Sequence, residues 1–465
     1  MPTHSQTLSF AVAALAAALG SPAAQAGQVE FGPDNGPGPS PAIAGQILPG
    51  HNLGGAKPAA AQAKPVQSAA EQAKMKAYLA SRVDRAAVHV SLKTAGGRAV
   101  DCVDIHAQPA VKNNPALFGQ PIQLAPRSAQ PVFAAEPADN IAEPLLDKSG
   151  AQVAGCPDGT VPIPEVTAED LSRFASLHDF FAKVPERLGT AQAPQTAVQP
   201  PYHWGPSSQH QYAHAYRYVT NWGASSNINV WAPYTELNSE FSLTQIWVVG
   251  GSGGGLQTLE VGSQKYRDLY GDYDPHLFIY STRDGYNHTG CYNNTCGDFV
   301  QVSHSIYPGA KLAPVSTYNG TQYEIQAQWF KDMDGGAWWL QVQGQWVGYY
   351  PRNLYNTAGV VNRAAEIDFG GEIIDNRNLN LHTSTDMGSG QFPGAWFGKA
   401  AYQRLLRYNY ATTANPNIVW YTNATGLTPT RSDAACYDIS YYNGDPNWGS
   451  YFFFGGPGYD YYNCR

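Results

Sequence analysis

Two glutamates in the second half of the chain have the residue type and the local sequence that acid–base chemistry needs. Glu260 lies in the strand-like run "LQTLEVG", directly after five glycines in the six positions 250–255, and Glu372 lies in "IDFGGEIID", directly after paired glycines. Glycine near a strand carboxylate lets a ligand's backbone come close. Two facing carboxyl groups cannot both ionise easily, so one can draw a proton from water while the other donates one.

Strand alternation gives a competing interpretation of the second glutamate. Glu372 would share a face with Glu366 and Asp368, and a row of acids is typical of a solvated face. A bulge at Gly370 and Gly371 would turn Glu372 inward. Spacing alone therefore leaves the pair as one hypothesis beside a structural interpretation.

Other groups of reactive residue types fit their chemistry less well. The glycine run lacks the Gly-Lys-Ser/Thr of a phosphate cradle and predicts a hairpin loop. Ser252 lies in G-G-S-G-G, but a nucleophile elbow joins a strand to a helix in a parallel sheet. His203, His210 and His214 have no evident carboxylate partner, so we expect surface or activation-region residues rather than a metal site.

The elements that must position the glutamates are predicted to be strands. All 11 Trp and all but one of the 29 Tyr follow residue 200. There the chain runs as short aromatic and β-branched stretches broken by Gly, Asn and Asp, such as "FSLTQIWVVG" and "WWLQVQGQWVG". Many such strands at close spacing predict an antiparallel sandwich or barrel. One helical signal remains, at Ala400–Tyr408.

The first half has different chemistry and predicts a small α+β unit. Residues 1–26 are typical of a secretory signal, with an apolar core and "AQA" before Gly27, although no Lys or Arg precedes the apolar run. Residues 27–66 are rich in Gly, Pro and Ala and predict disorder. Helices are predicted at Ser68–Ala86 and Thr167–Val184, and a linker at 189–206.

Charge and cysteine content limit the classes of partner and the compartment. Only 14% of residues are charged, and the net charge of −8 favours neither nucleic acid nor an anionic membrane as a partner.

Six cysteines suit an oxidising compartment and allow fifteen pairings. Their order along the chain favours Cys102–Cys156, Cys291–Cys296 and Cys436–Cys464. "CYNNTC" has metal-like spacing, but no second His or Cys cluster accompanies it.

A series of motifs in fixed order resembles the neprosin family of glutamic peptidases, which includes a prolyl endopeptidase. The resemblance spans residues 212–464, and the motifs that carry it are "GASSNINVWAP", "EFSLTQIWVV", "LQTLEVG", "LYGD", "LFIY", "DGYNHTGCYNNTCGDFVQVS", "WWLQVQGQWVGYYP", "FGGEI", "HTSTDMGSGQFP" and "WGSYFFFGGPG". The likeness of the first half to the family's activation segment is weaker.

The resemblance implies a secreted, acid-activated glutamic endopeptidase made as a zymogen. The catalytic glutamates would be Glu260 and Glu372, activating a water, with neither assigned as acid or base. The implied fold is a twisted antiparallel β-sandwich over 207–465. It follows an activation propeptide at 27–195, with cleavage at 189–206. The pairs Cys291–Cys296 and Cys436–Cys464 match family positions.

The implied partners are peptide or protein substrates and the chain's own propeptide as an intramolecular inhibitor. We expect a monomer without cofactor, metal, nucleic-acid or membrane partner. The family's preference is cleavage after proline. This chain departs from it at Ser263 and at Ser281 of "YST", where plant members carry Trp. If those rings shape the cleft, the preference would change.

Two other functions remain open at this point. Abundant Trp and Tyr would also suit a non-catalytic carbohydrate-binding sandwich, and a glycoside hydrolase also uses two carboxylates. Loss of either glutamate would leave sugar binding largely intact, whereas a peptidase would lose turnover.

Overall fold

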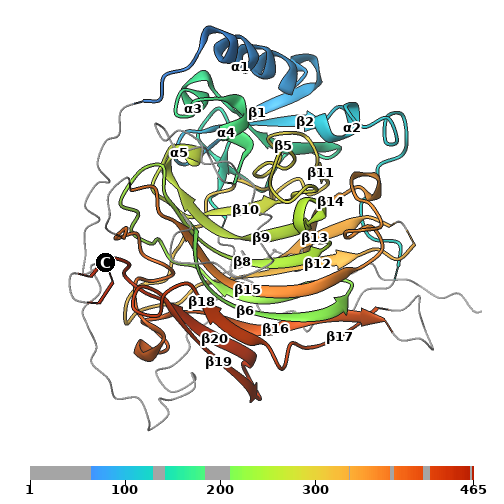
Figure 1. Ribbon diagram of the computed structural model, residues 1–465. Helices are drawn as coiled ribbons and strands as arrows, with labels where there is room; N and C mark the ends of the chain where they lie inside the picture. Colours follow the sequence, from blue (N-terminus) through green and yellow to red (C-terminus); the bar gives the residue numbers. More distant parts are fainter. Residues whose placement is uncertain are drawn as a thin grey trace, which may run out of the picture.

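The structure, a computed structural model, describes residues 64–128, 142–183, 210–334, 336–377, 382–411, 419–460 and 463–464. The predicted signal at 1–26, most of the segment 27–66 and the linker at 189–206 lie outside the described residues. A small α+β unit (residues 64–183, here the N-terminal unit) covers one side of a large antiparallel β-sandwich (Figure 1). The predicted fold class is confirmed.

The N-terminal unit is built on a five-stranded sheet of order β4-β3-β1-β2-β5. Its strands are β1 (Val88–Thr94), β2 (Ala99–Asp104), β3 (Leu145–Leu146), β4 (Gln152–Val153) and β5 (Thr160–Pro164). Its helices are α1 (Ala69–Arg82), the 3-10 turn η1 (Arg85–Ala87), α2 (Pro109–Lys112), α3 (Ala168–Leu171) and α4 (Leu177–Phe181).

The two helical predictions in this unit have different outcomes. Helix α1 begins as predicted, with the Ser68 side chain accepting a hydrogen bond from the Glu71 N–H. The single helix predicted at Thr167–Val184 is wrong, because two short helices form there. Ser176 caps α4 by accepting from the Asp179 N–H, and Phe174, between the helices, packs edge-on against Tyr266 of the sandwich. Burial of Phe174 against another element therefore overrides the helical periodicity.

The first sheet of the sandwich has six strands in the order β10-β9-β8-β15-β6-β18. They are β6 (His210–Asn221), β8 (Phe241–Gly250), β9 (Gln257–Tyr266), β10 (His276–Tyr280), β15 (Ala364–Ile374) and β18 (Thr428–Arg431). The predicted glycine loop joins β8 to β9 and contains the 3-10 turn η2 (Gly253–Gly255), and the short helix α5 (Arg267–Tyr270) follows β9.

The second sheet follows the order β11-β14-β13-β12-β7-β16-β20-β19, with β17 paired to β16. Its strands are β7 (Ala224–Asn229), β11 (Val300–Gln301), β12 (Glu324–Lys331), β13 (Trp338–Val342), β14 (Gln345–Tyr350), β16 (Ala401–Ala411), β17 (Val419–Asn423), β19 (Asp438–Asp445) and β20 (Gly449–Gly455). The 3-10 turns η3 (Arg352–Leu354) and η4 (Pro393–Ala395) lie in its connections.

The main hydrophobic core lies between the two sheets. It joins residues of the first sheet, such as Val261 and Phe369, to residues of the second, such as Trp329 and Phe452. Because side chains alternate along a strand, the residues between these on each strand of the first sheet point the other way. We call that second side of the six-stranded sheet the outer face, and the N-terminal unit packs against it (Figure 1).

The helix predicted at Ala400–Tyr408 is wrong, because this segment forms β16. Its register against β7 shifts between Arg404 and Arg407, and Leu405 has a positive φ of 52°. The irregularity breaks the alternation of apolar side chains, so the sequence loses the two-residue period of a regular strand.

All three expected cysteine pairs are disulfides. Cys102–Cys156 lies within the N-terminal unit, and Cys291–Cys296 and Cys436–Cys464 lie in the sandwich. In the described parts of the chain, no helix is both long enough and apolar enough to cross a membrane.

Candidate active site

Glu260 and Glu372 lie on the outer face of the six-stranded sheet. Glu260 belongs to β9 and Glu372 to β15, with β8 between them. Their strand neighbours Val261 and Ile373 point into the core between the sheets, so both glutamates point outward. The register of β15 runs without a shift from Glu366 to Ile374. Glu372 therefore reaches the outer face without a bulge.

Two glycines leave room between the glutamates. Gln245 of β8 pairs with Gly262 on one side and with Gly370 on the other, one outer-face row away from each glutamate. A Cβ on Gly262 would lie 1.9 Å from the Thr244 carbonyl oxygen, and one on Gly370 would lie 2.4 Å from the His214 Cα. No larger residue fits at either position, which explains why a glycine lies two residues from each carboxylate.

A lysine of the N-terminal unit fills this room. Lys183 Nζ lies 2.5 Å from Glu260 Oε2 and 2.8 Å from Glu372 Oε2, and its side chain is 4% exposed. The rings of Trp247 and Tyr286 lie 5.5 and 5.9 Å from the ammonium, within cation–π range. One cation therefore bridges the two carboxylates, so their Oε2 atoms can be no farther apart than the sum of the two distances.

The other partners of Glu260 are neutral. Its Oε1 atom accepts hydrogen bonds from Thr258 Oγ1 at 2.8 Å and from the Tyr286 hydroxyl at 2.6 Å. Both donors are uncharged hydroxyl groups. Without Lys183, Glu260 would keep two neutral donors on one oxygen.

Glu372 has a different set of partners, which includes a histidine. His210 Nδ1 lies 2.6 Å from its Oε1, and the Tyr212 hydroxyl donates to the same oxygen at 3.1 Å. Gln245 Nε2 donates to Oε2 at 3.0 Å. All three partners come from β6 and β8, which flank β15, so the sheet itself fixes the position of this carboxylate.

The charges at the site reinforce one another. Burial alone would raise the pKa of Glu372, but the charge of Lys183 and the hydrogen bond and charge of His210 outweigh burial and lower it to about 2. Burial would likewise lower the pKa of Lys183, but Glu260 and Glu372 raise it above its usual value. The lysine is thus held as an ammonium and Glu372 as a carboxylate.

A tyrosine hydroxyl and two backbone carbonyl groups of the sandwich anchor the N-terminal unit near Lys183. The Lys183 N–H donates to the Tyr280 hydroxyl at 3.3 Å. Arg98 donates to the Tyr270 carbonyl and Arg173 to the Asp268 carbonyl, each at 2.6 Å. These contacts tie the segment before β2, the segment between α3 and α4, and Lys183 itself to the sandwich.

A second anchor is a single carboxylate of the sandwich. Asp332 accepts from the Ser128 N–H and hydroxyl, the Arg127 N–H and the Gln123 amide, at 2.8–3.2 Å. Burial would raise the pKa of Asp332, but these donors outweigh it and lower the value. The contact is therefore strongest while Asp332 is ionised.

The remaining acids of β15 share the outer face but are not solvated. Glu366 and Asp368 are 3% and 2% exposed, so the expected solvated row is wrong. Burial raises the pKa of Glu366 to about 9, helped by the charge of Asp368. His214 Nδ1 lies 2.6 Å from Asp368 Oδ2. His210 and His214 are therefore buried partners of carboxylates, which corrects the surface location expected for them. His203 lies outside the described residues.

The two serines that depart from the family pattern do not face the glutamates. Ser263 lines a small cavity between the two sheets with Asn229 and Lys265. Ser281 is buried, and its hydroxyl bonds the Thr258 carbonyl and the Tyr355 hydroxyl. Neither serine side chain therefore lies beside Glu260 or Glu372, where it could shape the cleft directly.

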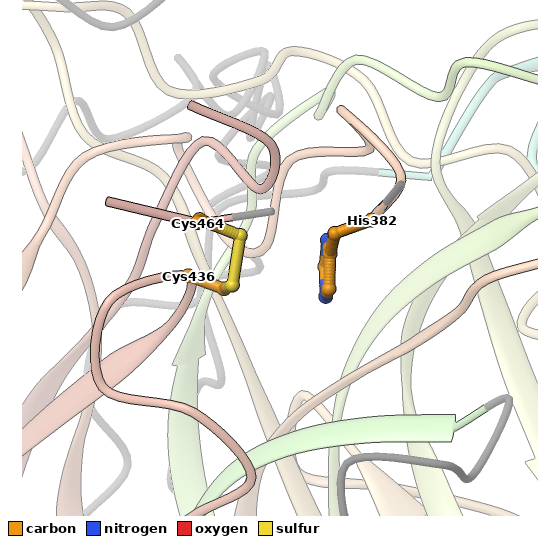
Figure 2. Close-up of side chains that lie close together, drawn as sticks. All are labelled: His382, Cys436 and Cys464. Carbon is orange, nitrogen blue, oxygen red and sulfur yellow. A yellow bond between two sulfur atoms is a disulfide. The ribbon is translucent and has the colours of Figure 1, made fainter. Parts of the chain in front are cut away.

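The other sequence candidates stay apart from the two glutamates. Ser252 is exposed in the β8–β9 loop, and the cysteines of "CYNNTC" are joined as a disulfide. Among the described residues, one group of metal-ligating types gathers, His382 with Cys436 and Cys464 (Figure 2). These two sulfurs are bonded to each other, so they offer no thiolate to a metal.

The sequence did not point to Lys183, Tyr286 or Gln245, and His210 was a candidate without its carboxylate partner. The histidine carried a usable signal, because His210 and His214 alternate with Tyr212 along "HQYAHAY", as expected of one face of a strand. Lys183 carried none, because it is 77 residues from Glu260 in the sequence.

Comparison with known proteins supports the resemblance found in the sequence. The Neprosin family model matches residues 238–457, and the model of the Neprosin activation peptide matches residues 91–216. The second match includes most of the N-terminal unit and extends into β6. Lys183 therefore lies within the activation peptide, and both glutamates lie within the Neprosin match.

Structural likenesses are weak. Crystal structures of scytalido-glutamic peptidase with transition-state analogues overlap at a TM-score of 0.29, with 10–11% identity over 54% of this chain and 98% of theirs. The chicken liver agglutinin CG-16 overlaps at 0.20, with 10% identity over 34% of this chain and 93% of its own. Overlaps of this extent carry no argument about activity.

Proposed function

The chain belongs to the neprosin family, and we propose that this peptidase is a glutamic endopeptidase in which Glu260 and Glu372 activate a water. The observation that carries the proposal is the bridge from one lysine ammonium to both carboxylates. A group as small as an ammonium contacts both of them at once, so a water in the same place would also lie within reach of both. Gly262 and Gly370, which flank Gln245 on the neighbouring strands, leave the space that a substrate backbone needs.

The proposed reaction uses one ionised and one protonated carboxyl group, as two close carboxylates favour. The base removes a proton from water while the water oxygen bonds to the peptide carbonyl carbon, and the acid protonates the carbonyl oxygen. The C–N bond then breaks, the leaving nitrogen takes the proton from the base, and the hydroxyl proton returns to the acid. One water is consumed, and a carboxyl group and an amine are formed.

In this proposal the propeptide inhibits by placing Lys183 where the water would act. An ammonium between the two carboxylates leaves no proton acceptor free and fills the space over Gln245. The enzyme is then made as a zymogen and activated by cleavage in residues 189–206. Acid favours release, because protonation of anchoring carboxylates such as Asp332 weakens the contact between the parts.

The remaining parts of the proposal are secretion and cleavage after proline. Three disulfides support an oxidising compartment. The aromatic rings of Trp247 and Tyr286 lie within cation–π range of the Lys183 ammonium, and a proline ring packs well on such surfaces. Ser263 and Ser281 do not face the glutamates, so the absence of Trp at these two positions is compatible with cleavage after proline.

Mass spectrometry of a proline-containing protein digested at acid pH tests the proposal. The acid-activated chain should produce new peptide ends, enriched in proline before the cut. The chain with Glu260→Gln and Glu372→Gln together, its propeptide removed by separable wild-type enzyme, should produce none, and Glu366→Gln is the matched buried-acid control. Full cleavage by the double variant would refute the dyad. Release of reducing sugar from polysaccharides, without new peptide ends, would favour a glycoside hydrolase.

A further inference from the structure

Two histidine–carboxylate pairs on β6 and β15 have the same geometry but different neighbours. His210 Nδ1 lies 2.6 Å from Glu372 Oε1, and His214 Nδ1 lies 2.6 Å from Asp368 Oδ2. All four residues are buried. Only the first pair contains one of the two glutamates bridged by Lys183.

The two glutamates therefore differ in what they retain once Lys183 leaves. Glu260 keeps the hydroxyl groups of Thr258 and Tyr286, both on Oε1. Glu372 keeps His210 and Tyr212 on Oε1 and Gln245 on Oε2. A protonated imidazole at hydrogen-bond distance favours the charged form of a carboxyl group much more than neutral hydroxyl groups do.

We propose that His210 is a positioning residue that keeps Glu372 ionised in the active enzyme, so that Glu372 is the base and Glu260 carries the proton. This inference rests on the proposed function and assigns the two roles within it. The imidazolium stabilises a negative charge on Glu372, and that charge in turn favours a proton on Glu260, whose Oε2 faces the same space.

Once Lys183 has left, His210 is the one basic side chain among the described residues that contact Glu372. The titratable groups facing it are Tyr212 and His210 from β6, Asp368 from β15, Glu260 from β9, Lys183 from the propeptide and Tyr292. The tyrosines stay neutral at acid pH. The negative charge of Asp368 opposes ionisation of Glu372, and His214 offsets part of it. The remaining positive contact is His210.

The pH dependence of kcat/KM for the acid-activated chain tests the role of His210. His210→Asn and His210→Gln both remove the charge while keeping an amide N–H donor. In both variants the acid limb of the profile should move to higher pH by about one to three units, the effect of one close opposite charge on a carboxyl pKa. Cleavage at the acid end should fall at least tenfold and recover as the pH rises.

His214→Asn is the matched control, because it breaks an identical pair on the same two strands. Its acid limb should coincide with that of the wild type. An unshifted limb in both His210 variants, or an equal shift in His214→Asn, would overturn the inference. Thermal unfolding and the mass of the new N-terminus confirm that each variant folds and is activated at the same place.

Activated substrates test the assignment of the two glutamates separately. A peptide ester with an electron-withdrawing leaving group has a more electrophilic carbonyl carbon, so attack by water needs little help from the acid on the carbonyl oxygen but still needs the base. Glu260→Gln should therefore regain a measurable part of the wild-type rate on the ester, and Glu372→Gln should not. The opposite order would overturn the assignment. Full activity of both variants on peptides would instead refute the proposed function.

Discussion

The two faces of β15 show how one strand serves stability on one side and chemistry on the other. Ile367, Phe369 and Ile373 point into the core between the sheets and are fully buried among apolar side chains. Glu366, Asp368 and Glu372 point to the outer face and are buried almost as deeply. Burial is thus the same on both faces, and what differs is the charge that each face must accommodate.

This difference implies that the two faces are stabilised by different interactions. The inner face is stabilised by packing, which does not depend on pH. The outer face needs a partner for each buried charge, and for Glu372 part of that partner set comes from the propeptide. Removing the propeptide leaves the inner face unchanged and takes from the outer face the cation that Glu260 and Glu372 share.

A cavity in the inner face should have the largest effect. Phe369→Ala removes a fully buried ring from the core, and such truncations cost about 3–5 kcal/mol of unfolding free energy. We expect a clearly lower midpoint in denaturant or thermal unfolding at neutral and at acid pH alike. A loss of stability confined to one end of the pH range would contradict the contrast between the faces.

Loss of the bridging cation should affect latency more than the stability of the sandwich. Lys183→Met leaves two buried carboxylates without their shared partner. Removing one partner of a buried ion pair costs about 3–5 kcal/mol of stability, because the remaining charge stays buried without compensation. That cost falls on propeptide docking, so the full-length chain should cleave peptides at a pH where the wild type is latent. Lys74→Met, which changes an exposed ion pair on α1, is the control. Unchanged latency would exclude Lys183 as the inhibitory group.

The carboxylate anchor should set the pH of activation. The pKa of Asp332 is lowered in the docked state, so its contribution to docking is present above the pKa of the free group. That contribution is lost as the pH falls through the lowered value. Asp332→Asn lacks it at every pH, so propeptide release, followed by gel electrophoresis over a pH series, should begin at a higher pH. Release at the wild-type pH would show that other groups control activation.

The smallest effect is expected at Ser263. Because its side chain lies in the cavity between the sheets, away from the glutamates, Ser263→Ala should leave the residue before each cut unchanged. Mass spectrometry of digests from the two enzymes checks this. A changed cleavage pattern would mean that the inner face influences the substrate site.

The sequence was sufficient to predict the features that depend on local pattern, namely the β-rich second half and the cysteine pairs. Spacing alone left Glu260 and Glu372 as one hypothesis beside a solvated face, and the family resemblance singled them out; their catalytic role stays a prediction. Glycines mark close approach, as the two beside Gln245 illustrate, since each is required by backbone contact with a neighbouring strand.

The other features of the site depend on contacts between residues far apart in the sequence, which no local pattern indicates. Strand order decides that His210 meets Glu372 and His214 meets Asp368, 162 and 154 residues away. The segments 167–184 and 400–408 both have helical periodicity, but Phe174 docks on the sandwich and Leu405 sits at an irregularity of β16. In each case tertiary packing overrode a local preference.

The most direct test of the account is the rate of peptide cleavage at acid pH by three single variants of the activated chain. Glu260→Gln and Glu372→Gln each remove one of the bridged carboxylates. Glu366→Gln removes a buried acid on the same face of β15, six residues before Glu372 and outside the Lys183 bridge. We predict that the first two lose at least a hundredfold in kcat/KM and that the third stays near the wild type. Comparable losses in all three, or normal rates in either of the first two, would contradict it.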